Sequence, residues 1–284
     1  MACHSLQSDP ARTAARAAAL DRYFAANVAA SGVLICATGA QCQASHFGDF
    51  YPAQQHHVGH HYDLVRDGKP LRIVVVGQEY GHGPAFATAT QRSDKIVGEI
   101  GTRRRFKADG TLKARNPHMR GCTSLVRLIF GLGLGTDYDG EFLDIAGDHV
   151  HIFECFALVN FLLCSAVPAS DLAQIESVGG KPGRSTRVMQ QSCETHFLAA
   201  LDILEPTLVV AQGYGVRRWI ARAYGLPARR PQDGVEQIQI RNTMVPLVSF
   251  SHPSAHGELN WGMNERTPYL LKTVEPTIAR VCGL

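Results

Sequence analysis

Three groups of polar side chains follow three apolar runs that are typical of buried strands. The runs are LRIVVV at residues 71–76, VHIFECFALV at 150–159 and VPLVSF at 245–250. The polar groups are Gln78, Glu79 and Tyr80, then Asn160, then His252 and Ser254. The carboxyl ends of parallel strands meet at one edge of a sheet, where α/β proteins bind their ligands. We therefore expect a carboxylate, an amide and an imidazole to meet at this edge, a set that many reactions use.

The elements that must position these side chains alternate between helices and strands. Apolar spacing predicts helices at residues 10–30, 123–132, 186–204, 216–224 and 267–281, the last tolerating Pro276 as a kink or early break. Two further strands are predicted at 207–211 and 236–240. This order predicts an α/β fold with three α/β/α layers and a central, mostly parallel sheet. A chain of 284 residues without a low-complexity linker is expected to form one domain, residues 1–284.

Residues 101–121 carry a local excess of positive charge. The formal net charge of the whole chain is only +3, so the distribution of charge has to indicate any nucleic-acid partner. Within this segment one acid, Asp109, stands against Arg103, Arg104, Arg105, Lys107, Lys113, Arg115 and Arg120. The segment lacks apolar periodicity, which predicts either a loop that faces DNA phosphates or a solvated basic loop without a partner.

The chain has eight cysteines and no sequence feature of secretion. No apolar run reaches the roughly 18 residues that a membrane helix needs, and the Ala-rich start has no signal-peptide core. We therefore expect a cytoplasmic chain without a membrane partner. A reducing compartment disfavours disulfides, which leaves a metal or cluster site, or buried free thiols, as alternatives. The run QQHHVGHH at residues 54–61 has no acid placed as in the zinc-hydrolase signature, and Gly59 disfavours a helix, which argues against a zinc site there.

Two motifs and the sequence between them resemble the uracil-DNA glycosylases. VVVGQEYG at residues 74–81 resembles their water-activating motif, and HPS at 252–254 resembles their second motif. The intervening chain is similar to the iron-sulfur uracil-DNA glycosylases, whose base-reading strand ends in Asn with a cluster cysteine four positions on, here Asn160 and Cys164. Cys193 then opens a helix that runs into the strand TLVVA. The resemblance covers residues 72–254 and implies a uracil-DNA glycosylase-like fold.

The resemblance implies roles for the matching residues. Glu79 would activate the attacking water, His252 would donate a hydrogen bond to the departing base, and Asn160 would read the base edge. Further substrate contacts are expected from Gln78, Tyr80, His118 and Ser254. The basic segment would contact DNA phosphates through Arg103, Arg104, Arg105 and Arg120. A structural [4Fe-4S] cluster, which ties an N-terminal helix and cluster-binding segment (1–65) to the sheet, would be held by Cys36, Cys42, Cys164 and Cys193.

Three departures from the family pattern bear on these roles. Cys36 and Cys42 are separated by five residues where the family has two, and Cys155 is an alternative ligand. Glu79 is the natural acid, because a glutamine holds the place of the family's first acid. His118 stands where the family has Phe, and an imidazole stacks on a base with less apolar area.

These features predict a DNA glycosylase that flips a base out of DNA and hydrolyses its N-glycosidic bond. The base is uracil or a modified pyrimidine, such as a hydroxymethylated or glucosylated cytosine of phage DNA, so repair and antiviral defence both stay open as roles. The alternative is an iron-sulfur DNA-binding relative without catalysis. We expect a monomer with DNA as its partner.

Overall fold

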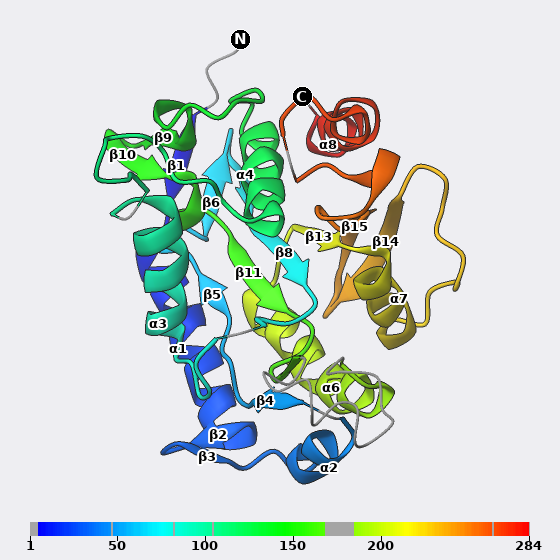
Figure 1. Ribbon diagram of the computed structural model, residues 1–284. Coiled ribbons are helices and arrows are strands. Elements are labelled where there is room, and N and C mark those ends of the chain that lie inside the picture. The colour runs from blue at the N-terminus through cyan, green and yellow to red at the C-terminus, as the bar shows by residue number, and fades with distance from the viewer. Residues whose placement is uncertain are drawn as a thin grey trace.

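The computed structural model describes residues 5–46, 48–81, 83–103, 105–167, 185–262 and 264–283. At its centre is a six-stranded sheet of order β14-β15-β13-β8-β11-β5 (Figure 1). The strands are β5 (His57–Val58), β8 (Ile73–Gly77), β11 (Ala157–Asn160), β13 (Leu208–Gln212), β14 (Val235–Ile240) and β15 (Thr243–Phe250). The four inner strands are parallel, and each edge strand is antiparallel to its neighbour. The predicted α/β class with a mostly parallel central sheet is therefore confirmed.

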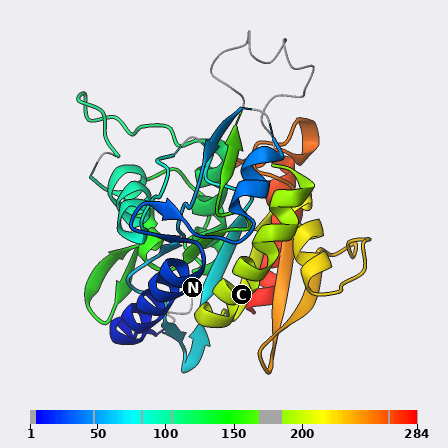
Figure 2. The same cartoon turned by 90° about the horizontal axis from the view of Figure 1, so that it is seen from below.

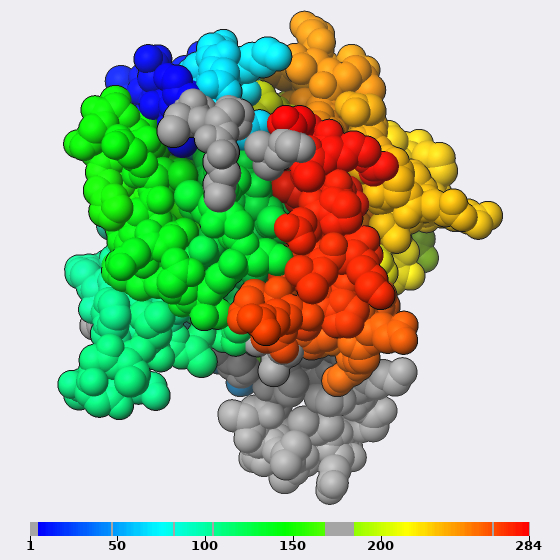
Figure 3. Space-filling model, turned by 90° about the horizontal axis from the view of Figure 1, so that it is seen from above, coloured from blue at the N-terminus to red at the C-terminus, as the bar shows by residue number. Residues whose placement is uncertain are grey.

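Both faces of this sheet are buried. Because successive residues of a strand point to opposite faces, alternate residues belong to two different cores. On β8, Ile73 and Val75 join one core, and Val74 and Val76 join the other. The first core lies under α4 (Pro117–Ile129), η5 (Leu270–Val274) and α8 (Glu275–Cys282), and the second under α1 (Pro10–Asn27), α6 (Arg187–Leu204) and α7 (Tyr214–Ala223). Figure 3 shows α8 packed beside the segment that contains α4. Burial on both faces explains why the strands are continuous apolar runs.

Shorter elements surround the sheet. The small strands are β1 (Leu6–Ser8), β2 (Ala29–Ala30), β3 (Val33–Leu34), β4 (Asp49–Tyr51), β6 (Leu64–Arg66), β7 (Lys69–Leu71), β9 (Phe142–Ile145), β10 (Asp148–His151) and β12 (Ser165–Val167). The short helical elements are α2 (Gly39–Ala44), α3 (Ala89–Ser93), η1 (Asp94–Gly101), η2 (Asp139–Glu141), η3 (Ile152–Glu154) and η4 (Gly257–Leu259). Among the described residues, no helix is both long and apolar enough to cross a membrane.

The predicted strand at residues 150–159 is wrong in its extent. Its first two residues belong to β10, the turn η3 follows, and only β11 joins the central sheet. His151 Nδ1 accepts the backbone N–H of Phe153 at 3.1 Å, which caps the turn. Ile152 and Phe153 are fully buried within this turn. The apolar run therefore continues through the turn η3, and the sequence pattern does not show that the strand ends there.

Helix α4 begins at Pro117 instead of at residue 123, because a capping residue precedes it. Asn116 Oδ1 accepts the backbone N–H of Met119 at 2.9 Å, and proline is favourable at the first helical position. This start places His118 and Arg120 in the first turn of a helix rather than in a loop.

Between Phe106 and Leu112 the basic segment projects from the body of the molecule (Figures 2 and 3). Its two arms are joined by a bridge between Phe106 and Leu112. The closing helix predicted at 267–281 is divided into η5 and α8, with Pro276 in the first turn of α8. Proline is tolerated there because the first-turn N–H groups have no partner within the helix.

Candidate functional site

The carboxyl edge of the central sheet brings Asn160 and His118 together above Gly77. Asn160 ends β11 and pairs with Gly77 at the end of β8, while His118 reaches the same place from α4. A Cβ atom at position 77 would lie 3.0 Å from Asn160 Oδ1 and 3.3 Å from His118 Cε1. Glycine at this position therefore allows both side chains to approach the strand closely.

The amide of Asn160 is buried without a full set of partners. The residue is 1% exposed, and its Nδ2 has no hydrogen-bond partner in the described part of the chain. A buried donor of this kind costs about 1–3 kcal/mol, so folded proteins keep few of them. A ligand that offers an acceptor above Gly77 would satisfy this donor.

His252 follows β15 and lies nearly parallel to His118, with ring centroids 6.1 Å apart and ring planes at 17°. Its Nδ1 accepts the backbone N–H of Ser254 at 3.2 Å and lies 2.7 Å from Ser254 Oγ. Because a backbone N–H can only donate, the neutral ring carries its proton on Nε2. Partial loss of hydration lowers the pKa of His252. Burial, and then the charges of His252 and Arg92, lower the pKa of His118 to about 3, so both rings are neutral at pH 7.

Glu79 and Gln78 form a second group, on the side of the site that faces β12. Glu79 Oε2 accepts the backbone N–H of Ala166 at 3.2 Å, and Glu79 Oε1 accepts from Gln78 Nε2 at 3.0 Å. Gln78 Nε2 also donates to Ser185 Oγ at 2.8 Å. Burial raises the pKa of Glu79, against the lowering effect of its two hydrogen bonds. Among the described contacts, none joins this carboxylate to the two imidazoles.

Arg92 and Gln212 are site residues that the sequence analysis missed. The guanidinium carbon of Arg92 lies 3.5 Å from the ring centroid of Tyr80, a cation–π contact. Arg92 is 5% exposed, its Nε has no partner among the described residues, and no sequence pattern marks it. Gln212 is buried at the end of β13, with its Nε2 also unpartnered in the described ranges. Asn160 is selected because it is a polar residue at the end of a predicted strand, and the same reasoning selects Gln212.

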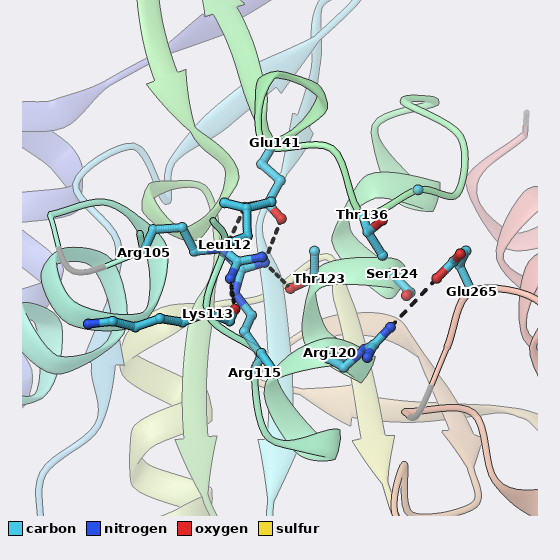
Figure 4. Close-up of a pocket in the computed structure, with 12 residues that line it drawn as sticks. Arg105, Leu112, Lys113, Arg115, Arg120, Thr123, Ser124, Thr136, Glu141 and Glu265 are labelled. Atoms are coloured by element: carbon cyan, nitrogen blue, oxygen red, sulfur yellow. Dashed lines mark hydrogen bonds and ion pairs between the residues drawn. The ribbon is translucent and has the colours of Figure 1, made fainter. Parts of the chain in front are cut away.

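The basic residues predicted to contact DNA separate in space. Arg103 is exposed and pairs with Asp94 of η1. Arg105 and Arg120 line a pocket beside α4 (Figure 4). Arg104 lies outside the described residues. The segment therefore presents its charges at two different places.

Four cysteines from three segments of the chain converge beside α6. Burial raises the pKa values of Cys164 and Cys193. The nearby Cys164 adds to the effect on Cys193, and Cys42 and Cys36 make smaller contributions to both. The contact between Cys36 Sγ and His196 Nε2, at 3.4 Å, lowers the pKa of Cys36 to about 7. All four are free thiols. Across the described ranges, no three His, Cys, Asp or Glu side chains are arranged to hold a metal ion.

Comparison with known proteins finds no protein-family model and no curated protein that matches this sequence. The arrangement of side chains at the sheet edge is therefore the basis for a functional assignment. That arrangement combines a buried amide, two neutral imidazoles and a carboxylate with a raised pKa.

Proposed function

We propose that this protein is a DNA glycosylase of the uracil-DNA glycosylase superfamily that removes uracil or a modified pyrimidine. The observation that carries the proposal is the Nδ2 donor of Asn160, which has no partner among the described residues and is buried above Gly77 beside two neutral imidazoles. A side-chain amide offers both a donor and an acceptor, which matches the hydrogen-bonding edge of a pyrimidine. Such a site reaches a base only after the nucleotide has been flipped out of the duplex.

Cleavage of the N-glycosidic bond leaves positive charge on the sugar and negative charge on the base. His252 is suited to the base, because Ser254 occupies Nδ1 and leaves the Nε2–H free to donate to a base oxygen. The neutral ring can donate this hydrogen bond without first taking up a proton. Glu79 supplies the negative charge that stabilises the sugar and the acceptor that orients or deprotonates the attacking water.

Four further residues contribute to the site in this proposal. The partly buried ring of His118 stacks on the base, and Tyr80 forms a wall that Arg92 holds in place. An imidazole is smaller than a phenyl ring, which leaves more room for a modified pyrimidine such as a hydroxymethylated or glucosylated cytosine. Leu259 in η4 is 43% exposed and would fill the gap that a flipped nucleotide leaves.

We further propose that the four thiols beside α6, which do not form a metal-binding group as they stand in the described residues, draw together around a [4Fe-4S] cluster. They are Cys36, Cys42, Cys164 and Cys193. Soft thiolates are the ligands of such clusters, and this one would cross-link α2, α6 and the end of the central sheet in a structural role. Cys155 lies in the opposite core, under α4, which argues against it as a ligand.

Replacement of Cys193 by alanine is expected to remove most of the bound iron, because the cluster would lose one ligand. Cys155→Ala removes a thiol of comparable burial from the other core and should keep the iron content of the wild-type protein. Iron and acid-labile sulfide analysis, with the visible absorption spectrum, measures the difference. Equal iron in the two variants, or none in the wild-type protein, would contradict the cluster.

The rate of base removal is expected to fall on acidification with a midpoint above the ordinary pKa of a glutamate. The ionised carboxylate is the active form, and burial raises the pKa of Glu79, so protonation sets in at a higher pH than for an exposed carboxyl. Single-turnover rates across the acid range measure the midpoint. A rate that stays constant down to about pH 4.3, the reference value for Glu, would exclude this role for Glu79.

Formation of abasic sites tests the proposed activity directly. The purified protein is incubated with duplexes that contain uracil, hydroxymethylcytosine or glucosylated hydroxymethylcytosine, and alkali converts abasic sites into strand breaks. Breaks at one of these bases identify the substrate, and Glu79→Ala should abolish them. DNA binding without breaks at any of the three would favour a non-catalytic DNA-binding protein instead.

A further inference from the structure

A pocket of about 240 Å³ lies beside α4 and shares no lining residue with the site around Asn160. Its walls come from the projecting basic segment, from α4 and from the loops near η2 and η5. We name it the arginine pocket. Its lining includes Arg105, Arg115, Arg120, Ser124, Thr136 and Glu265. Figure 4 shows Arg115 between Arg105 on one side and Arg120 with Glu265 on the other.

The charge of Arg115 is already neutralised within the protein. Its Nη1 and Nη2 donate to Glu141 Oε1 and Oε2, both at 2.6 Å. Both side chains are buried, with exposures of 4% and 1%. This bidentate ion pair lines the arginine pocket without a free charge. The other cations of the pocket are the ones that can bind a ligand.

Arg105 is a buried cation without a carboxylate partner in the described part of the chain. It is 7% exposed, its Nη1 donates to the carbonyl oxygen of Lys113, and its Nε has no partner there. Burial of an unpaired charge is unfavourable, because water no longer solvates it and no counter-charge replaces the water. An anion in the arginine pocket would provide that counter-charge.

Arg120 is only loosely paired. Its Nη2 lies 3.6 Å from Glu265 Oε2, and the two side chains are 30% and 31% exposed. A strong charge-assisted hydrogen bond is shorter, about 2.7–2.9 Å, so this pair is a weak one that a better anion can displace. Ser124 and Thr136 add hydroxyl donors to the same wall.

We propose that the arginine pocket binds a phosphate group, which Arg105 and Arg120 hold after Glu265 is displaced. The planar guanidinium presents parallel N–H donors that match phosphate oxygens. The cavity is smaller than the roughly 300 Å³ at which ligand pockets for drug-sized molecules begin, so it accepts a phosphate and little of the attached nucleoside.

The phosphate is assigned to the DNA strand whose base enters the site at Asn160, an assignment that rests on the proposed function. His118 and Arg120 are two positions apart in the first turn of α4 and therefore point to different sides of the helix. A strand that crosses this end of α4 places a base on one side and a phosphate on the other. The positive end of the helix dipole also favours an anion here.

Two variants with opposite expected effects test the arginine pocket. Arg120→Ala removes a phosphate ligand, and we expect about tenfold weaker duplex binding and a salt-dependence slope reduced by about 0.9. Glu265→Gln removes the competing carboxylate, and we expect about threefold tighter binding. Arg280→Ala removes an arginine from an exposed pair with Asp233 and should leave the affinity unchanged. Fluorescence anisotropy over a series of salt concentrations measures all four proteins.

A neutral methylphosphonate, substituted at one DNA position at a time, locates the phosphate. At one position near the target base it should weaken wild-type binding about tenfold and weaken binding of Arg120→Ala no further. Unchanged affinity and slope in both pocket variants, or a wild-type protein that binds neither duplex nor nucleotide, would overturn the proposal.

A deoxynucleoside monophosphate in place of the duplex separates the two possible sources of the phosphate. If the nucleotide binds in a manner that depends on Arg120 and the duplex does not, the assignment to DNA is overturned and the pocket serves a free nucleotide. All of these measurements record binding without base removal. Failure of the glycosylase assay and failure of the arginine pocket are therefore distinguishable.

Discussion

A Glu79→Gln variant is expected to remove bases about 10²- to 10⁴-fold more slowly than the wild-type protein. The amide has nearly the same size and retains an oxygen that can accept the N–H of Ala166. It carries no negative charge to stabilise the sugar cation, and it cannot take a proton from water. Single-turnover kinetics on the base identified by abasic-site formation measures the loss.

The same variant should bind DNA normally and be slightly more stable than the wild-type protein. Because burial raises the pKa of Glu79, the folded state favours the protonated carboxyl, and stability is lost as the pH rises and the group ionises. Glutamine does not ionise, so the variant avoids this loss of stability at pH 7. Glu154→Gln changes a carboxylate at the opposite end of β11, which accepts the N–H of His60 at 2.9 Å, and should keep the wild-type rate. A wild-type rate in Glu79→Gln would refute the catalytic role.

A Glu141→Ala variant is expected to lose about 3–5 kcal/mol of unfolding free energy. The substitution leaves the Arg115 guanidinium buried without its carboxylate. It also removes the partner of His151, whose Nε2 lies 3.1 Å from Glu141 Oε2. Denaturant unfolding followed by circular dichroism measures the change.

A double variant, Arg115→Met with Glu141→Leu, is the control, because it replaces both charges with apolar groups of similar volume. It should regain most of the stability. Burial acts to raise the pKa of Glu141, but hydrogen bonds from His151 and Arg115 outweigh it and hold the pKa at about 2. The contribution of Glu141 is therefore present above the ordinary pKa of a glutamate and declines as the pH falls toward 2. A difference between wild type and Glu141→Ala that does not change with acid would contradict this account.

Much of the central sheet could be predicted from its apolar runs. The run from Ile73 to Val76 is continuous because two cores cover the two faces of β8. Glu79 and Asn160 could then be predicted as site residues, because they follow or end such strands. Their partners need not be known for this prediction. The run at residues 150–159 predicted too long a strand, because side chains in a turn can be as buried as those in a strand.

The partners of these side chains could not be predicted, because they come from segments without a local pattern. Arg92 of α3 meets Tyr80 through the packing of α3 against the edge strand β5. Arg105 stands in a run of basic residues and is nevertheless buried. The approach of Cys36 to Cys193 likewise depends on how α2 packs on α6. The catalytic roles of Glu79 and His252 stay predictions, which the variants above test.

In the proposed glycosylase, the absence of a side chain at Gly77 would set how deeply a base can enter the site. Asn160 and His118 both rest against a position that has no side chain, so any larger residue there would push the two outward. In the proposed glycosylase, a change in the accepted base would therefore be easier at position 118, where the ring size can vary at the start of α4, than at position 77. On the same proposal, the substrate range would change through residue 118 while the sheet beneath it stays constant.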